Sequence, residues 1–356
     1  MVLKNPARFA LAAVIACLPL SGCYLMQAAR GQLQVMSARE PVDQVIASSG
    51  TADTLKQQLI RARRIRDYAS QELGLPDNAA YRSYADIGRP YVVWNVVATP
   101  EFSVHPRTWC FPIAGCVAYK GFFGEQDAKA FAAKLKEQGD DVVMGGVSAY
   151  STLGLIADPL LNTFTGYPEI DLAALIFHEL AHQVAYLPGD SSFNEAFATA
   201  VEEAGVARYA AQLEDRNALP RWQQRRRLRV EVTAVVAAAR ADLAKLYREK
   251  IPADDMRAAK QKHLAELAAQ IRAIEQRTGR ASGFDGYIKE GLNNAHLASL
   301  ATYYDKVPYF ESLLRDRCGG YLPCLYALAQ AEVTDRQAEG RSRANARPPG
   351  PRPGPN

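Results

Sequence analysis

The chain has 356 residues, 48% of them hydrophobic, and its formal net charge is +4 at pH 7. This length and apolar content are ample for a packed core in one or two domains. The small net charge, with acidic residues interspersed among the basic ones, argues against a protein that binds nucleic acid.

The first 22 residues are typical of a secretory signal. Lys4 and Arg8 form a basic start, and the apolar run from Phe9 to Leu20 is too short for a stable transmembrane anchor. The segment Leu20-Ser21-Gly22-Cys23 resembles a bacterial lipobox, in which the cysteine is lipidated and becomes the first mature residue. Because Tyr24 follows, and not the aspartate that retains lipoproteins in the inner membrane, we expect a periplasmic lipoprotein anchored to the outer membrane. An ordinary cleaved signal is the alternative.

Periodic hydrophobic patterns predict helices and strands in the next part of the chain. The run 91–98 is rich in β-branched and aromatic residues and predicts a buried strand. The run 54–73 predicts a helix with leucines and an isoleucine on one side and many arginines on the other. The predicted helices cover residues 25–36, 54–73 and 127–138, and the predicted strands cover residues 91–98, 117–123 and 141–147.

Two histidines, His178 and His182, lie in an apolar stretch that is expected to be helical from Pro168 to about Leu187. Residues four apart share one face of a helix, so both imidazoles can bind the same metal ion. Glu179 follows the first histidine, where a carboxylate can take a proton from a water that the metal activates. The His-Glu-x-x-His pattern therefore indicates a zinc hydrolase. A buried helix whose histidines bond to carbonyl groups is the alternative.

A third ligand is needed, because catalytic zinc sites usually have three protein ligands and keep one position for water. The segment Phe193-Asn194-Glu195-Ala196-Phe197-Ala198 resembles the gluzincin metallopeptidases, in particular the aminopeptidase N family. That resemblance implies that Glu195 is the third zinc ligand and that Glu202, two helical turns further on, supports a ligand histidine. The alternatives are a helix-capping role for Glu195, paired with Ser192, and a solvated helix face for Glu202.

The chain resembles more closely a group of bacterial lipoproteins described as predicted zinc-dependent aminopeptidases. The gluzincin resemblance further implies that residues 150–154 form an edge strand that pairs with an extended peptide substrate. An ordinary sheet edge explains that segment equally well. The segments that match the bacterial lipoproteins, besides the metal helix, are Cys23-Tyr24-Leu25, residues 27–32, Trp109-Cys110-Phe111-Pro112, Ala114-Gly115-Cys116, residues 150–154, Asp158-Pro159 and Leu292-Asn293-Asn294-Ala295.

Four cysteines remain in the mature chain besides Cys23. They form two pairs with matched spacing, and the oxidising periplasm favours a disulfide that closes each local loop, although four cysteines allow three connectivities. Zinc binding by these thiols is disfavoured because the two-residue spacing of zinc knuckles is missing. The expected disulfides are Cys110–Cys116 and Cys318–Cys324.

The segment 205–280 is almost entirely helical in pattern, and Ile251-Pro252 interrupts it, which predicts a long helical hairpin. The run Arg225-Arg226-Arg227 suggests an anion or nucleic-acid patch, but we favour a solvated helix face because acidic residues are interspersed. Downstream, Tyr303 and Tyr304 are candidates for binding the oxyanion of a tetrahedral intermediate, with His296 behind them. Residues 336–356 are predicted to be a disordered tail.

These patterns predict an α+β, predominantly helical fold. It would contain a gluzincin or thermolysin-like metallopeptidase core with a small sheet, a zinc helix and the helical hairpin, spanning residues 23–335 after a signal peptide of residues 1–22. The expected function is zinc-dependent hydrolysis of peptides, most simply as an aminopeptidase, with Zn²⁺ as cofactor. The alternatives are an endopeptidase and a non-catalytic envelope lipoprotein whose metal site is structural.

Overall fold

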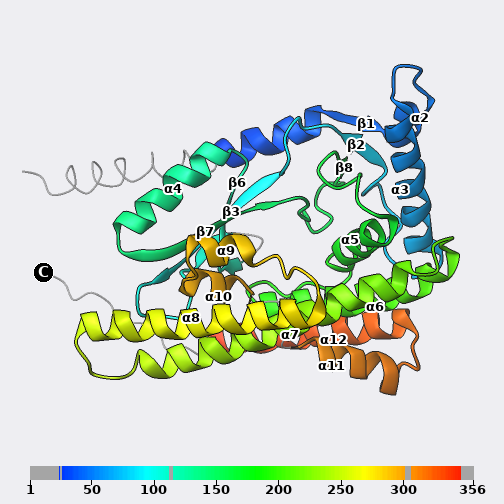
Figure 1. Cartoon of the computed structure of the whole chain (residues 1–356). Helices are drawn as coiled ribbons and strands as arrows, with labels where there is room; N and C mark the ends of the chain where they lie inside the picture. Colours follow the sequence, from blue (N-terminus) through cyan, green and yellow to red (C-terminus); the bar gives the residue numbers. More distant parts are fainter. Residues whose placement is uncertain (1–23, 25, 112–114, 301–305, 346–356) are drawn as a thin grey trace, which may run out of the picture.

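The structure is a computed structural model that describes residue 24 and residues 26–111, 115–300 and 306–345. The predicted signal peptide, the lipidation site Cys23, the oxyanion candidates Tyr303 and Tyr304, and the last part of the predicted tail (346–356) lie outside the described residues. The described part is mainly helical with small sheets, so the predicted α+β class is confirmed (Figure 1).

The largest sheet has the order β6-β3-β7, with the long strand β3 (Val93–Pro100) between β6 (Lys120–Phe122) and β7 (Asp140–Val147) in antiparallel pairing. One face packs on α4 (Glu125–Glu137), because Val96 and Ala98 alternate along β3 on the side that faces this helix. The predictions of a strand near 91–98, a helix near 127–138 and a strand near 141–147 are therefore confirmed.

The predicted strand 117–123 is wrong, because this stretch contains two strands that belong to different sheets. Among the described residues, β5 (Gly115–Val117) pairs with β4 (Trp109–Phe111) alone, whereas β6 pairs with β3. Cys110 lies opposite Cys116 in the β4–β5 register, so their disulfide closes a separate small hairpin. The chain turns between Val117 and Lys120 to reach the larger sheet.

A third small sheet, β1-β2-β8, joins distant segments. β1 (Arg39–Pro41) runs antiparallel to β2 (Ser83–Ala85), which runs parallel to β8 (Leu160–Leu161). The sequence predicts an edge strand at residues 150–154, in the segment before β8. That prediction is wrong, because these residues do not form a strand. The Thr152 hydroxyl donates a hydrogen bond to the Ile156 carbonyl and accepts one from the Ile156 N–H. The Thr152 N–H donates to the Asp158 carboxylate. Leu153 also has a φ of 57°, which an extended strand cannot contain.

The main hydrophobic core is built by helices from the early, middle and final parts of the chain. It includes α3 (Asp53–Gln71), α5 (Glu169–Ala181), α6 (Ser191–Tyr209), α11 (Val307–Ser312) and α12 (Leu322–Asn345). The helix predicted at 54–73 is confirmed, but one of its arginines is not on the outer side. Arg66 is fully buried and donates hydrogen bonds to the carbonyls of Pro76, Asn78 and Ala80, which holds the loop after α3.

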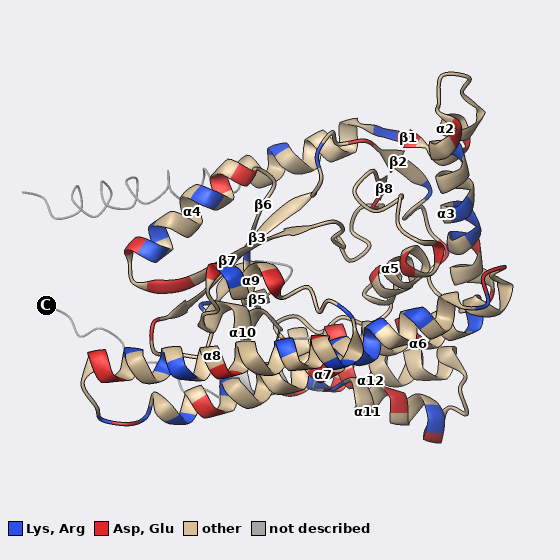
Figure 2. Cartoon of the chain, in the orientation of Figure 1, with Lys and Arg blue, Asp and Glu red and all other residues tan. Residues whose placement is uncertain are grey.

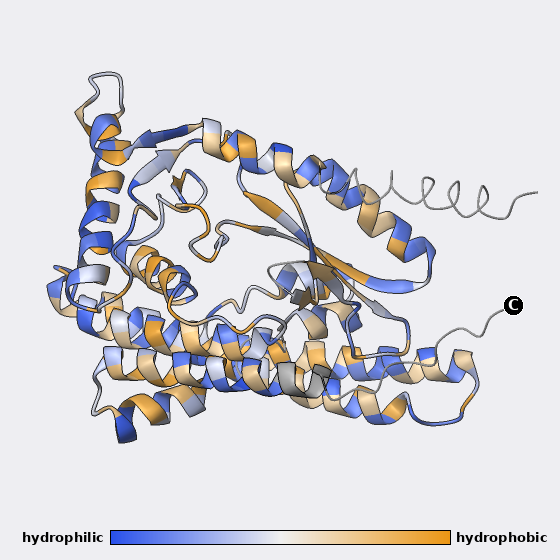
Figure 3. Cartoon of the chain, turned by 180° about the vertical axis from the view of Figure 1, so that it is seen from behind, coloured by the Kyte–Doolittle hydropathy of each residue, from blue (hydrophilic) through white to orange (hydrophobic). Residues whose placement is uncertain are grey.

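The predicted hairpin is present as α7 (Ala218–Leu246) and α8 (Ala253–Thr278), which lie side by side along one edge of the molecule (Figure 1). Leu243 and Ile271 are fully buried in the core that they share. Basic and acidic residues alternate along both helices (Figure 2), and apolar residues alternate with polar ones (Figure 3). The hairpin starts later than predicted, because α6 continues to Tyr209 and a short 3-10 helix (Ala210–Gln212) precedes α7.

The remaining helices are short. α2 follows β1, α9 and α10 pack beside the hairpin, and a π-helical turn leads from α11 towards α12. Their bounds are Val42–Ala47 for α2, Asp285–Glu290 for α9, Asn294–Leu300 for α10 and Leu313–Arg317 for the π-helical turn. Residues 26–37 form a helix, as expected for 25–36. None of the helices in the described part of the chain combines the length and apolar character needed to cross a membrane.

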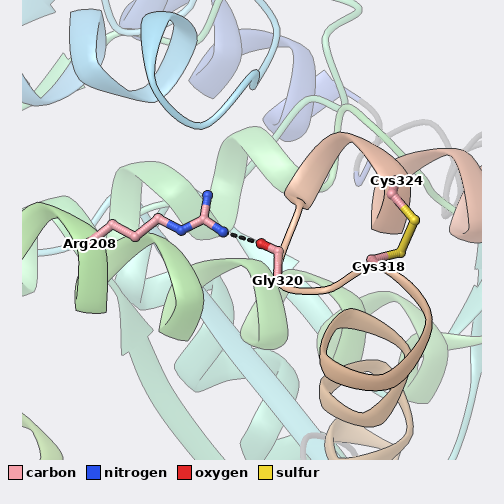
Figure 4. Close-up of a disulfide and its surroundings, with 4 residues drawn as sticks. All are labelled: Arg208, Cys318, Gly320 and Cys324. Carbon is pink, nitrogen blue, oxygen red and sulfur yellow. Dashed lines mark hydrogen bonds between the residues drawn. A yellow bond between two sulfur atoms is a disulfide. The ribbon is translucent and has the colours of Figure 1, made fainter.

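The C-terminal segment packs against α6. Phe310 of α11 contacts the rings of Phe193 and Phe197, with centroids 5.2 and 5.6 Å apart. The disulfide Cys318–Cys324 closes the turn before α12, where the Gly320 carbonyl accepts a hydrogen bond from Arg208 of α6 (Figure 4). Both predicted disulfides are thus confirmed.

α12 continues to Asn345, so the disordered tail does not begin at residue 336 as predicted. The physical reason is an ion pair. Arg336 lies 2.7 Å from Asp190, the residue that caps α6, and Lys306 lies 3.0 Å from the same carboxylate. The polar composition after residue 335 therefore belongs to a helix that is held to the rest of the molecule by charge.

Candidate metal centre

His178 and His182 lie at the end of α5, one helical turn apart. Glu169 and Asp171 occupy the first turn of this helix after Pro168, where negative charge is favourable, and the apolar residues that follow are buried in the main core. The two imidazole rings lie with centroids 4.8 Å apart and nearly perpendicular. The helix itself ends at Ala181, earlier than predicted, although His182 still has helical backbone angles.

The loop from α5 to α6 is closed by Asn194. Its side chain accepts a hydrogen bond from the Leu187 N–H (2.7 Å) and donates one to the Leu187 carbonyl (2.9 Å). The N-cap of α6 is Asp190, which accepts from the Phe193 N–H, so the capping alternative for Glu195 is not realised. Glu195 is therefore free to point at the histidines.

The three predicted ligands come together. Glu195 Oε2 lies 3.3 Å from His178 Nε2, and Glu195 Oε1 lies 3.8 Å from His182 Nε2. The three donor atoms are all within 4.8 Å of one another, and no fourth histidine, cysteine or acidic residue of the described chain joins the group. Two imidazoles and one carboxylate on adjacent rigid helices fit a divalent ion that keeps a position open for another ligand.

Glu202 supports this group from the next turns of α6. Its Oε2 lies 3.0 Å from His178 Nδ1, a contact that favours a proton on Nδ1, and Nε2 is the ring nitrogen that faces Glu195. The solvated-face alternative does not describe Glu202, whose side chain is 16% exposed. The neighbouring Glu203 points elsewhere, to an ion pair with Arg226 of α7. His182 has no such support: its Nδ1 is buried without a hydrogen-bond partner among the described residues.

The electrostatics of the group favour a cation. Burial by itself would lower the pKa of His178, but the hydrogen bonds and charges of Glu195 and Glu202 outweigh it and raise that pKa well above its usual value. Burial and the nearby His178 lower the pKa of His182 to about 4. Burial, with the negative charges of Glu195, Asp158 and Glu202, raises the pKa of Glu179 to about 7. The carboxylates of Glu179, Glu195, Glu202 and Asp158 thus lie near one another with little positive charge beside them. A bound divalent cation would supply that positive charge.

A family of proteins with the description "Putative aminopeptidase" matches residues 23–344 of the chain. The chain belongs to this family. The match covers every helix and strand that builds the metal centre, and the family's description makes peptide hydrolysis the activity to consider. No curated protein and no solved structure matched the chain.

Two tyrosines of this family member that the sequence did not single out lie close to the centre. Burial, then the charges of Glu195 and Glu179 among others, raises the pKa of Tyr119 to about 12, and burial and Glu195 raise the pKa of Tyr186. Both phenols therefore stay protonated and can donate hydrogen bonds. Tyr186 lies only four residues after His182, so its nearness in the sequence could have revealed it, although it lies beyond the end of α5. Tyr119 follows β5, and no local pattern connects it to the histidines.

The remaining oxyanion candidate, His296, is engaged elsewhere. It lies on α10, which packs on β3, β7 and α7, and its Nδ1 is 2.8 Å from the side chain of Asn293. Its ring lies against that of Tyr287, with centroids 4.8 Å apart and the ring planes inclined by 57°. His296 therefore belongs to the core beside the hairpin and not to the metal centre.

The β4–β5 hairpin approaches the loop between α5 and α6 closely. Gly115 has a φ of 74°, and a Cβ built on it would lie 2.8 Å from the backbone nitrogen of Gly189, in the loop before α6. Only glycine allows this close approach. The Cys110–Cys116 hairpin thus packs directly on the loop that connects the two metal-binding helices.

Proposed function

We propose that the protein is a zinc-dependent peptidase. The convergence of His178, His182 and Glu195, with Glu179 beside them, carries this proposal, together with membership of a family described as aminopeptidases. Two imidazoles and one carboxylate form a ligand set that catalytic zinc uses. Bound zinc would lower the pKa of a water molecule from about 15.7 towards 7 and polarise a peptide carbonyl.

Each protein group then has a defined task. Glu179 accepts the proton of the attacking water and delivers it to the leaving amine, because its buried carboxylate follows a ligand directly in the chain. Glu202 keeps His178 in one tautomer and one ring orientation. The protonated phenols of Tyr119 and Tyr186 are candidates for hydrogen bonds to the oxyanion.

An aminopeptidase also needs an acidic group for the free ammonium of its substrate. Glu101 is bound by Arg257 at 2.6 Å, and Glu203 is bound by Arg226, so both are already neutralised. Asp158 is buried, holds the Thr152 N–H at 2.9 Å, and is close enough to Glu179 to raise the pKa of that residue. We therefore assign the ammonium contact to Asp158.

Hydrolysis rates of free and N-acetylated forms of the same short peptides distinguish an aminopeptidase from an endopeptidase. We expect acetylation to lower kcat/KM by about 10- to 100-fold, because it removes a charge-assisted hydrogen bond to Asp158. Asp158→Asn should reduce this ratio between the free and acetylated peptides. Equal rates for both forms in the wild-type protein would show an endopeptidase and remove the role of Asp158.

We also propose that a lipid at Cys23 anchors the protein on the periplasmic face of the outer membrane. The family match begins at this cysteine, which supports a mature chain that starts there. The mass of the N-terminal peptide of protein purified from bacterial envelopes tests the anchor. A peptide that begins at residue 23 and carries acyl chains is expected, and an unmodified N-terminus would exclude the anchor.

A further inference from the structure

A cavity of about 490 Å³ opens between α5, α6 and α7, next to the metal centre. His178 and Glu179 line one part of it, and Asp171, near the start of α5, lines another. These residues share one face of α5, and the seven-residue step from Asp171 to His178 corresponds to roughly 10 Å along the helix. The cavity is therefore long enough to hold a substrate residue that flanks the reacting bond.

One wall of the cavity comes from α7. Trp222, Arg225, Arg226 and Arg229 lie at intervals of three, four and seven residues, which places them on one face of this helix. Trp222 is 8% exposed and forms an apolar surface with Ala174 and Leu175 of α5. The prediction of a solvated face is thus wrong for Arg226, whose side chain is 12% exposed.

The residues that line two adjacent hollows show how the arginines are distributed along α7. Ala218, Arg221 and Arg225 border a neighbouring hollow together with residues 168–171 at the start of α5. Of these two hollows, Arg226 and Arg229 border the cavity that contains His178 and Glu179. Arg229 is thus the last of the cavity-lining arginines along α7 and lies away from the hollow at the start of α5.

The charges of this wall are not fully compensated. Arg225 forms an ion pair with Asp171 at 2.5 Å, and Arg226 forms one with Glu203. Glu202 is bound to His178. Within the part of the chain that the structure describes, Arg229 forms no ion pair, and its side chain is exposed. A guanidinium is thus available at the end of an apolar surface.

We propose that this cavity is a subsite for a carboxylate-bearing substrate residue next to the scissile bond, and that Arg229 determines this preference. The proposal rests on the proposed peptidase function. The apolar part of the residue packs on Trp222 and Leu175, and its carboxylate accepts two parallel hydrogen bonds from the guanidinium of Arg229. Asp171, Glu179 and Glu202 in the same cavity repel a phosphate more strongly than a singly charged carboxylate.

Two sources can supply this carboxylate, an acidic side chain or the C-terminus of a dipeptide, and matched peptides distinguish them. The kcat/KM ratio is measured for Glu against Gln on each side of the cleaved bond, and for free against amidated C-termini of dipeptides. We expect one of these ratios to exceed about tenfold and to fall towards one in Arg229→Gln. Arg227→Gln is the matched control, because Arg227 is an exposed arginine of the same helix that does not line the cavity.

Charge reversal makes the test stricter. Arg229→Glu should favour peptides with Lys over Glu at the selected position, which simple misfolding would not produce. Unchanged ratios in both Arg229 variants would overturn the proposal, even if the wild-type protein hydrolyses peptides.

A binding measurement keeps the subsite testable if the wild-type protein hydrolyses no peptide and the proposed function fails. Titration calorimetry with Leu-Glu, Leu-Gln and the C-terminal amide of Leu-Gln should then show weaker binding of the dipeptide that lacks the recognised carboxylate, Leu-Gln for a side-chain source or its amide for a C-terminal source, and a loss of this difference in Arg229→Gln. Equal binding of all three dipeptides to the wild-type protein would reject the subsite.

Discussion

Glu179→Gln is expected to keep its bound metal and to lower kcat for peptide hydrolysis by about 10²- to 10⁴-fold, the usual contribution of a general base. The amide has nearly the shape of the carboxylate but cannot accept the proton of the attacking water. Metal content and kcat of purified wild-type and variant protein measure both effects. Wild-type turnover in the variant would exclude Glu179 as the base and would favour another proton acceptor.

The same residue predicts how activity depends on pH. Burial raises the pKa of Glu179 to about 7, and a bound cation acts in the opposite direction. Because only the ionised carboxylate is a base, kcat/KM should fall as the pH decreases through an apparent pKa at or below about 7. An acidic limb that is identical in wild-type and Glu179→Gln protein would assign this titration to another group.

Glu195→Gln is expected to lose the metal. It removes the only carboxylate of the three-donor group, so zinc affinity should fall by more than the roughly 10- to 100-fold that loss of a supporting hydrogen bond costs. Glu202→Gln should show that smaller loss, because Glu202 acts through His178. Zinc titration with a competing chelator measures all of these affinities. Glu203→Gln is the control, since this neighbour pairs with Arg226 and should bind zinc like the wild type.

Thermal unfolding gives an independent result for the same variants. Zinc at about 100 times its Kd should stabilise the wild-type protein by about 2.7 kcal/mol, and this increment should disappear in Glu195→Gln. A variant that still binds zinc tightly would show that Glu195 is not a ligand. Zinc binding with stabilisation but no peptide turnover in the wild type would favour the non-catalytic alternative.

The residues that meet at the metal centre could be predicted because helical repeats relate them. A spacing of four places His178 and His182 on one face of α5, and a spacing of seven places Glu195 and Glu202 on one face of α6. Both regularities can be read from the chain without knowing how the helices pack. The long hairpin was predictable for the same reason, since Ile251-Pro252 separates two helical runs.

Features that depend on packing between distant segments could not be predicted. Tyr119 reaches the centre from a different part of the chain, and the cavity exists only because α7 packs beside α5. Composition was misleading where a few polar contacts decide the structure. Arg336 lies in a polar stretch but is held by Asp190, and the turn at Thr152 is stabilised by its own hydroxyl.

The donors and their support all come from the stretch between His178 and Glu202, on two helices joined by a loop that Asn194 closes. Bringing such near neighbours together costs little chain entropy, and contacts of this kind form early when a protein folds. The ion-binding unit can therefore assemble before the sheets and the hairpin dock around it. Its geometry is a local property of one helix pair, and the rest of the molecule decides what reaches it.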